Sequence, residues 1–156
     1  MKGDTQVLQL LNTCLGDQLT AINQLFLHAR ISRNWGLGEF NEYEYKRSIE
    51  AMKAADALIE RMLFLEGVPN LQTAGKLMIG RDIPKILQGD LKLLTAVRDN
   101  LLTTIGACEQ TRDFVSRDEL TEILEQTEEH IDWVETQQWL IENSGLENYL
   151  QSQMGD

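Results

Sequence analysis

The chain has 156 residues, of which 42% are hydrophobic and 25% are charged, a composition that is ordinary for a globular protein. We therefore expect one domain over residues 1–156. Acidic residues number 25 against 14 basic ones, which gives a formal net charge of −11. This excess of negative charge argues against nucleic acid or an anionic membrane as the main partner, and it favours the attraction of cations.

The cysteines and the N-terminal residues predict a cytoplasmic protein. Cys14 and Cys108 are the only cysteines and form no CxxC motif. Since each falls in a helical pattern, we expect both to be small buried side chains in a reducing compartment. The first residues lack the apolar segment of a signal peptide, and no uncharged apolar run approaches the roughly 18 residues of a membrane span.

Four long helical patterns and one short one follow along the chain. Apolar spacing predicts helices over residues 5–35, 41–66, 83–112 and 117–144, and a short amphipathic helix over 146–150. Gly36, Gly67 and Gly145 are expected to end the first, second and fourth helices. Ser116 is the expected N-cap of the fourth helix, with Glu119 completing a capping box three residues later.

The lengths of the connections predict the topology. The first and second helices are joined by a few residues, as are the third and fourth, so each pair should form an antiparallel hairpin. Residues 67–82 form a longer connection that contains Pro69 and Gly75. Two short links around one long crossover are typical of an all-α, ferritin-like four-helix bundle, here with a short C-terminal fifth helix.

The second helix carries two apolar stripes. The first consists of Ala51, Ala54, Leu58, Met62 and Leu65, and the second of Tyr45, Ile49, Met52, Ile59 and Leu63. A helix that packs only into its own bundle needs one such stripe. The second stripe indicates a partner subunit, and the alternative is a broad apolar face within a monomer.

Ten segments spread over the whole chain resemble bacterioferritin. They are Met1–Thr5, Ala21–Gln24, Phe26–Arg30, Asn34–Leu37, Ile59–Arg61, Phe64–Gly67, Pro69–Gln72, Val115–Asp118, His130–Trp133 and Asn148–Gln151. The resemblance implies a hollow shell of 24 subunits that stores iron as a ferric mineral, with haem b bound between pairs of subunits.

The resemblance also implies a di-iron oxidation site, and this chain departs from it. Proteins of this class take one Glu from each of two helices and a Glu-x-x-His pair from each of the other two. The family pattern falls on Gln18 in the first helix, Ala51 and Ala54 in the second, Leu94 in the third, and Thr127 and His130 in the fourth. Of these only His130 is a residue of the ligand type, so we expect no intact di-iron centre and no catalytic residues.

Neighbouring residues do not restore the predicted site. Glu50, Glu128 and Glu129 lie one or two positions away, and a shift of one residue turns a side chain by about 100° around the helix. We therefore expect these glutamates to face solvent or the interior of the shell. Leu94, Ala51 and Ala54 are interpreted as a repacked core, and His130 as a core histidine whose hydrogen-bond partner is Gln18 or Thr127.

The haem site is expected at Met52. A lone methionine at helical spacing is by itself usually core packing. The resemblance changes this interpretation, because the bacterioferritin haem takes one axial thioether from each of two subunits at this position. The residues that would line the same pocket are Leu19, Asn23, Phe26, Tyr45 and Ile49.

Three basic residues depart from the family's surface pattern. Arg81 and Lys85 stand near the outer edge of the expected haem, where the family usually presents acidic residues, while Asp82 is retained between them. If the bacterioferritin-associated ferredoxin docks there, the two changes would weaken or redirect docking. Neutral drift of the surface is the alternative, and Lys46 on the presumed interior side is equally ambiguous.

Three functions are compatible with these patterns. The first is a haem-binding, ferroxidase-inactive cage subunit that co-assembles with a ferroxidase-competent bacterioferritin subunit. The second is a homo-oligomeric haem-binding cage that stores iron without catalysed oxidation. The third, a monomeric bundle with an unrelated ligand, is disfavoured by the second apolar stripe.

Overall fold

A computed structural model describes residues 1–72 and 74–155 of the chain. The described residues form five helices and no strands: α1 (Thr5–Asn34), α2 (Gly38–Phe64), α3 (Ile83–Gln110), α4 (Phe114–Ser144) and α5 (Leu146–Ser152). The predicted all-α class is therefore confirmed. The predicted domain of residues 1–156 includes Thr73 and Asp156, which lie outside the described residues.

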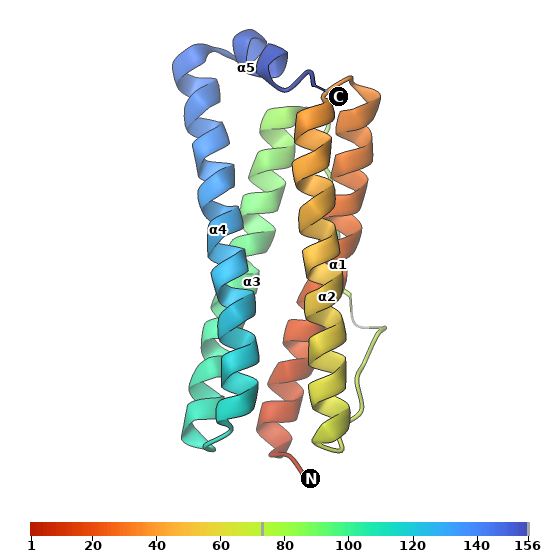
Figure 1. Cartoon of the computed structure of the whole chain (residues 1–156), viewed down its shortest axis with the longest axis vertical. Coiled ribbons are helices and arrows are strands. Elements are labelled where there is room, and N and C mark those ends of the chain that lie inside the picture. The colour runs from red at the N-terminus through yellow and green to blue at the C-terminus, as the bar shows by residue number, and fades with distance from the viewer. Residues whose placement is uncertain (73, 156) are drawn as a thin grey trace.

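The four long helices form a bundle with one long crossover (Figure 1). α1 and α2 are antiparallel, as are α3 and α4. α2 and α3 run in the same direction because residues 65–82 travel the length of the bundle between them. α5 lies across the end of the bundle where the α1–α2 turn lies, and the Glu39 N–H donates to the Gln153 carbonyl at 3.1 Å. This arrangement confirms the predicted ferritin-like topology, and no described helix is long and apolar enough to cross a membrane.

Polar side chains of α1 hold the crossover against the bundle. Asn12 accepts from the Asn70 N–H and donates to the Val68 carbonyl, while Thr20 accepts from the Gly75 N–H at 2.7 Å. Further along, Gln24 and His28 accept from the N–H groups of Met78 and Gly80. Residues 20, 24 and 28 are spaced by one helical turn, so they form one row on α1 that satisfies the backbone of the crossover.

The buried faces agree with the sequence patterns. All five residues of the first α2 stripe are buried, and Leu94 is buried in a second cluster near Phe40 and Val134. Cys14 and Cys108 are free and buried, as predicted. Burial raises the pKa of the Cys14 thiol to about 11 and that of Cys108 to about 12, so both remain protonated and unreactive at neutral pH.

Most helix ends lie within two or three residues of the predicted positions, but the predicted N-cap of α4 is wrong. Asp113 is the N-cap, and its carboxylate accepts from the Ser116 N–H at 3.1 Å and from the Ser116 hydroxyl at 2.6 Å. Because the carboxylate stands three residues earlier, Ser116 falls inside the helix. Glu119 forms no capping box, and its Oε2 is buried without a hydrogen-bond partner among the described residues.

We expect Asp113→Ala to lower the free energy of unfolding by about 1–2 kcal/mol, because Asp113 caps α4 and also accepts from Arg61 of α2 at 2.8 Å. Partial burial raises the pKa of Asp113, but the bonds from Ser116 and Arg61 outweigh it and hold the pKa below the usual 3.8. The contribution is therefore present above pH 3.8 and is lost as the pH falls further. Urea unfolding at pH 7 measures this loss of stability, and Asp118→Ala, at an exposed position, is the control. Equal unfolding midpoints for the two variants would contradict the prediction.

Candidate functional site

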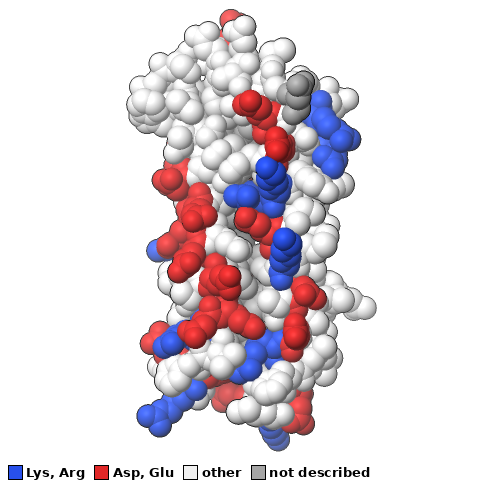
Figure 2. All heavy atoms as spheres, viewed as in Figure 1, with Lys and Arg blue, Asp and Glu red and all other residues white. Residues whose placement is uncertain are grey.

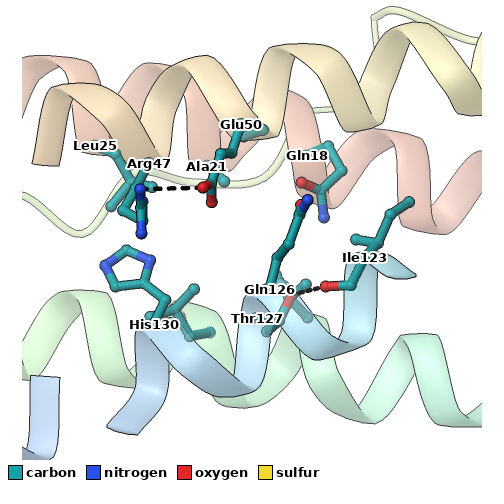
Figure 3. Close-up of a pocket in the computed structure, with 12 residues that line it drawn as sticks. Gln18, Ala21, Leu25, Arg47, Glu50, Ile123, Gln126, Thr127 and His130 are labelled. Carbon is teal, nitrogen blue, oxygen red and sulfur yellow. Dashed lines mark hydrogen bonds and ion pairs between the residues drawn. The ribbon is translucent and has the colours of Figure 1, made fainter. Parts of the chain in front are cut away.

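A cavity of about 30 Å³ lies between the four long helices, where the sequence places the degenerate iron site (Figure 3). Five of the six degenerate positions line it: Gln18, Ala51, Leu94, Thr127 and His130. The sixth, Ala54, is buried in the adjoining core and does not line the cavity. A space of this size suits one water molecule held by polar neighbours.

His130 is 3% exposed, and its Nε2 has no hydrogen-bond partner in the described part of the chain. The predicted bond to Gln18 or Thr127 is wrong. Thr127 instead donates to the Ile123 carbonyl at 2.8 Å, as helical threonines often do to the residue four positions earlier. Burial, assisted by the nearby Arg47 charge and opposed by Asp90, lowers the pKa of His130 to about 4, so its imidazole is neutral at pH 7.

Arg47 of α2 also lines the cavity, and sequence reasoning missed it. Its guanidinium pairs with Glu50 at 3.0 Å (Figure 3). It also lies 4.6 Å from the centre of the Tyr43 ring. Arg47 precedes Ala51 by four residues, so the two share a helix face, and this spacing is the signal that would have revealed it. A guanidinium keeps its positive charge at every physiological pH.

The neighbouring glutamates behave differently from one another. Glu128 pairs with Arg98 at the surface and Glu129 is exposed, in agreement with prediction. Glu50 was expected to turn away, and it lines the cavity instead because Arg47 holds its carboxylate there. The described walls of the cavity therefore offer one carboxylate that is already paired, one neutral imidazole, and the uncharged side chains of Gln18, Gln126 and Thr127.

The residues predicted around haem lie in two rows on α1 and α2. Leu19, Asn23 and Phe26 stand on α1, and Tyr45, Ile49 and Met52 on α2, in each case over seven residues or about 10 Å. The rings of Phe26 and Tyr45 are 6.2 Å apart. Since the helices are antiparallel, equal steps from this pair bring Leu19 and Met52 to matching heights.

These rows form an exposed surface within the single chain. Met52 is 52% exposed, Phe26 46% and Tyr45 36%, while Leu19 and Ile49 are half-buried. Arg30 covers one end, 5.0 Å from the Phe26 ring centre and 4.6 Å from that of Tyr45. A neutral thioether on an accessible, mostly apolar face is a donor that fits haem iron.

Comparison with known proteins decides the family. A family model described as a ferritin-like domain matches residues 8–144. The chain is 43% identical to a "Bacterial ferritin" of Pseudomonas aeruginosa, covering 99% of this chain and 100% of that protein. It is 42% identical to a "Bacterial ferritin" of Synechocystis sp. over 99% of both, and 39% identical to a "Bacterioferritin" of Mycobacterium avium over 96% and 94%. The chain belongs to the bacterioferritin family.

The three basic residues that depart from the family's surface pattern are exposed in this bacterioferritin chain. Arg81 and Lys85 face solvent, and Lys46 pairs with Glu42 at 2.9 Å. Asp82, which lies between Arg81 and Lys85 in the sequence, is the N-cap of α3 and accepts from the Lys85 N–H at 2.8 Å. Its presence therefore has a structural reason, since an N-cap carboxylate satisfies an N–H at the helix start.

A second polar cluster lies in the core, and the sequence analysis did not find it. Atoms of His28, Glu44 and Asp90 that could bind a metal ion all lie within 4.8 Å of one another, and all three residues are fully buried. Glu44 follows buried Phe40 by four residues and precedes buried Ser48 by four. A carboxyl group on a buried helical face is the signal that was available in the sequence.

Proposed function

We propose that this chain is a haem-binding, ferroxidase-inactive subunit of a bacterioferritin-type iron-storage cage, and that it assembles with a ferroxidase-competent subunit. One observation carries the proposal. The cavity at the di-iron position holds a guanidinium already paired with the one carboxylate that lines it.

The charge of the cavity argues against iron oxidation. Two ferrous ions bring a charge of four, and hard cations require anionic oxygen ligands to replace their hydration. Here Arg47 adds a positive charge, Glu50 is engaged by it, and the imidazole of His130 is neutral. Entry of iron would have to break the ion pair and would gain at most one carboxylate, whereas the paired side chains are stable without metal.

Haem binding is supported by the exposed face around Met52. A two-fold interface joins a surface patch to its own copy, so a second subunit would bring a second Met52 opposite the first. Burying Phe26, Tyr45 and the Met52 side chain between two subunits would remove apolar surface from water. Bound haem would supply an electron carrier, and this chain's residues would ligate it and exclude water from it.

Iron storage is supported by the charge of one face. Figure 2 shows acidic side chains along the face formed by α4 and α2, with basic ones interspersed along α2. Exposed acidic residues of α4 include Glu122, Glu125, Glu128, Glu129 and Asp132. A surface with this sign of charge concentrates cations, and we assign it to the side that meets stored iron.

Expression of a tagged copy together with a ferroxidase-competent bacterioferritin tests the assembly. We expect the tagged chain to retain its partner through size exclusion at the size of a cage, and intact-mass spectrometry to give two subunit masses. The untagged chain expressed with an unrelated tagged protein is the control for carry-over. A single mass in a cage of full size would instead support the homo-oligomeric alternative.

A further inference from the structure

Two carboxyl groups lie close together in the core, near the degenerate cavity but not among the residues that line it. Glu44 of α2 and Asp90 of α3 are each 0% exposed. Neither forms an ion pair with a lysine or arginine among the described residues. Two adjacent carboxylates that are buried together cannot both be ionised without a compensating cation or proton.

The hydrogen bonds around Asp90 define the state of His28. The Gly80 N–H donates to His28 Nε2 at 3.0 Å, so Nε2 is the unprotonated nitrogen of a neutral imidazole. The proton is therefore on Nδ1, which donates to Asp90 Oδ1 at 2.8 Å. Gln24 donates to the same oxygen at 2.9 Å. Two donors on one oxygen identify Asp90 as the ionised member of the pair.

Three carboxyl oxygens remain without a partner in the described chain: Asp90 Oδ2, Glu44 Oε1 and Glu44 Oε2. A metal ion would have to use these three oxygens alone, because the lone pair of His28 is occupied by the Gly80 N–H. Three oxygens from two side chains fall short of the four protein ligands of a structural zinc site. A proton between the two carboxyl groups needs one donor and one acceptor, and these oxygens supply both.

We propose that Glu44 keeps its proton and that its O–H donates a hydrogen bond to Asp90 Oδ2. This one proton is then a structural part of the core and acts as a pH-sensitive latch. The latch joins Glu44 on α2 to Asp90 on α3. Through Gln24 and His28 on α1 it also reaches the backbone of Met78 and Gly80 in the crossover. Loss of the proton would leave two like charges inside this network.

The other titratable groups around the pair do not supply a substitute charge. Arg47 on α2 favours loss of the Glu44 proton, but its charge is already paired with the Glu50 carboxylate. Tyr43 on α2 and Tyr149 on α5 are neutral phenols with raised pKa values, and Tyr149 donates to Gln137. His130 on α4 is neutral. Burial and the charge of Asp90 accordingly raise the pKa of Glu44 well above 4.5.

The sign of the pH effect follows from this direction. Because the folded chain holds the Glu44 proton more tightly than the unfolded chain, its stabilising effect is complete below pH 4.5 and is lost as the pH rises through the folded pKa. Between pH 4.5 and the folded pKa of Glu44, the folded chain binds one more proton than the unfolded chain. The equilibrium constant for unfolding therefore rises about tenfold per pH unit in this range.

Glu44→Gln and Asp90→Asn separate the two roles. Glutamine reproduces the donor of a protonated Glu44, so we expect Glu44→Gln to assemble normally and to lose this tenfold slope. Asparagine at 90 loses the charge that accepts from Gln24 and His28, so Asp90→Asn should unfold at markedly lower urea. Glu60→Gln, at an exposed position on the same helix, is the control and should keep the wild-type slope.

Infrared spectroscopy of the assembled wild-type protein provides a readout that does not depend on the variants. At a pH where glutamic acids with the ordinary pKa of 4.5 are already ionised, we expect the C=O stretching band of a protonated carboxyl group, which disappears at higher pH and is absent from Glu44→Gln. Absence of the band from the wild type, an unchanged slope in Glu44→Gln, or a metal ion that co-purifies with the wild type and is lost from Glu44→Gln would each overturn the proposal.

Discussion

Assembled from this chain alone, the protein is expected to oxidise ferrous iron no faster than buffer with dissolved air. The reason is the paired guanidinium at the cavity, where Arg47 and Glu50 are 3.0 Å apart and His130 is the one remaining ligand type. Stopped-flow absorbance of ferric species after mixing with Fe²⁺ measures the rate. A ferroxidase-competent bacterioferritin assayed in parallel should be faster by at least about a hundredfold, a factor that corresponds to roughly 2.7 kcal/mol in the barrier.

Restoring the family's ligands tests whether Arg47 itself contributes to the loss. One variant carries Gln18→Glu, Ala51→Glu, Ala54→His, Leu94→Glu and Thr127→Glu, and a second adds Arg47→Gln. We expect rapid oxidation in the second variant and at least tenfold less in the first, because the guanidinium would repel iron and engage one of the new carboxylates. Equal oxidation rates in the two variants would show that Arg47 does not contribute to the loss of activity. Iron oxidation by the wild type above background would contradict the proposal that its cavity is inactive.

The fold could be predicted because its signals are local. Glycines mark the helix ends, and the long connection of residues 67–82 distinguishes one crossover from an up-down-up-down bundle. The start of α4 was missed because two candidate caps stand three residues apart, and Asp113 also gains a bond from Arg61, which lies far away in the sequence.

The matched ligand positions lead to a cavity, but they do not reveal all the side chains that set its charge. Five of the six matched ligand positions line the cavity, but matching them passed over Arg47, which is not a ligand position. The predicted hydrogen-bond partner of His130 was wrong because the Thr127 hydroxyl donates to the Ile123 carbonyl of its own helix instead. Glu44 and Asp90 were missed since each is unremarkable on its own helix and becomes informative only when burial brings them together.

Met52→Leu is expected to abolish haem binding while leaving assembly intact. Leucine matches methionine in volume and apolarity but lacks the thioether, and a half-exposed position tolerates such a change at small cost in stability. In the proposed two-fold assembly both subunits would contribute Met52, so one substitution would remove both thioether ligands. Reconstitution with haem followed by visible spectroscopy should show the low-spin haem bands in the wild type and not in Met52→Leu.

Met62→Leu is the matched control for this experiment. Met62 lies on the same helix, but it is fully buried and belongs to the stripe that faces the chain's own core. The variant should therefore bind haem as the wild type does, even if repacking lowers its stability by up to about 1.5 kcal/mol. Haem retained by Met52→Leu, or lost equally by both variants, would place the haem ligand elsewhere. The exposed apolar face of α1 and α2 would then be an interface between subunits without a cofactor.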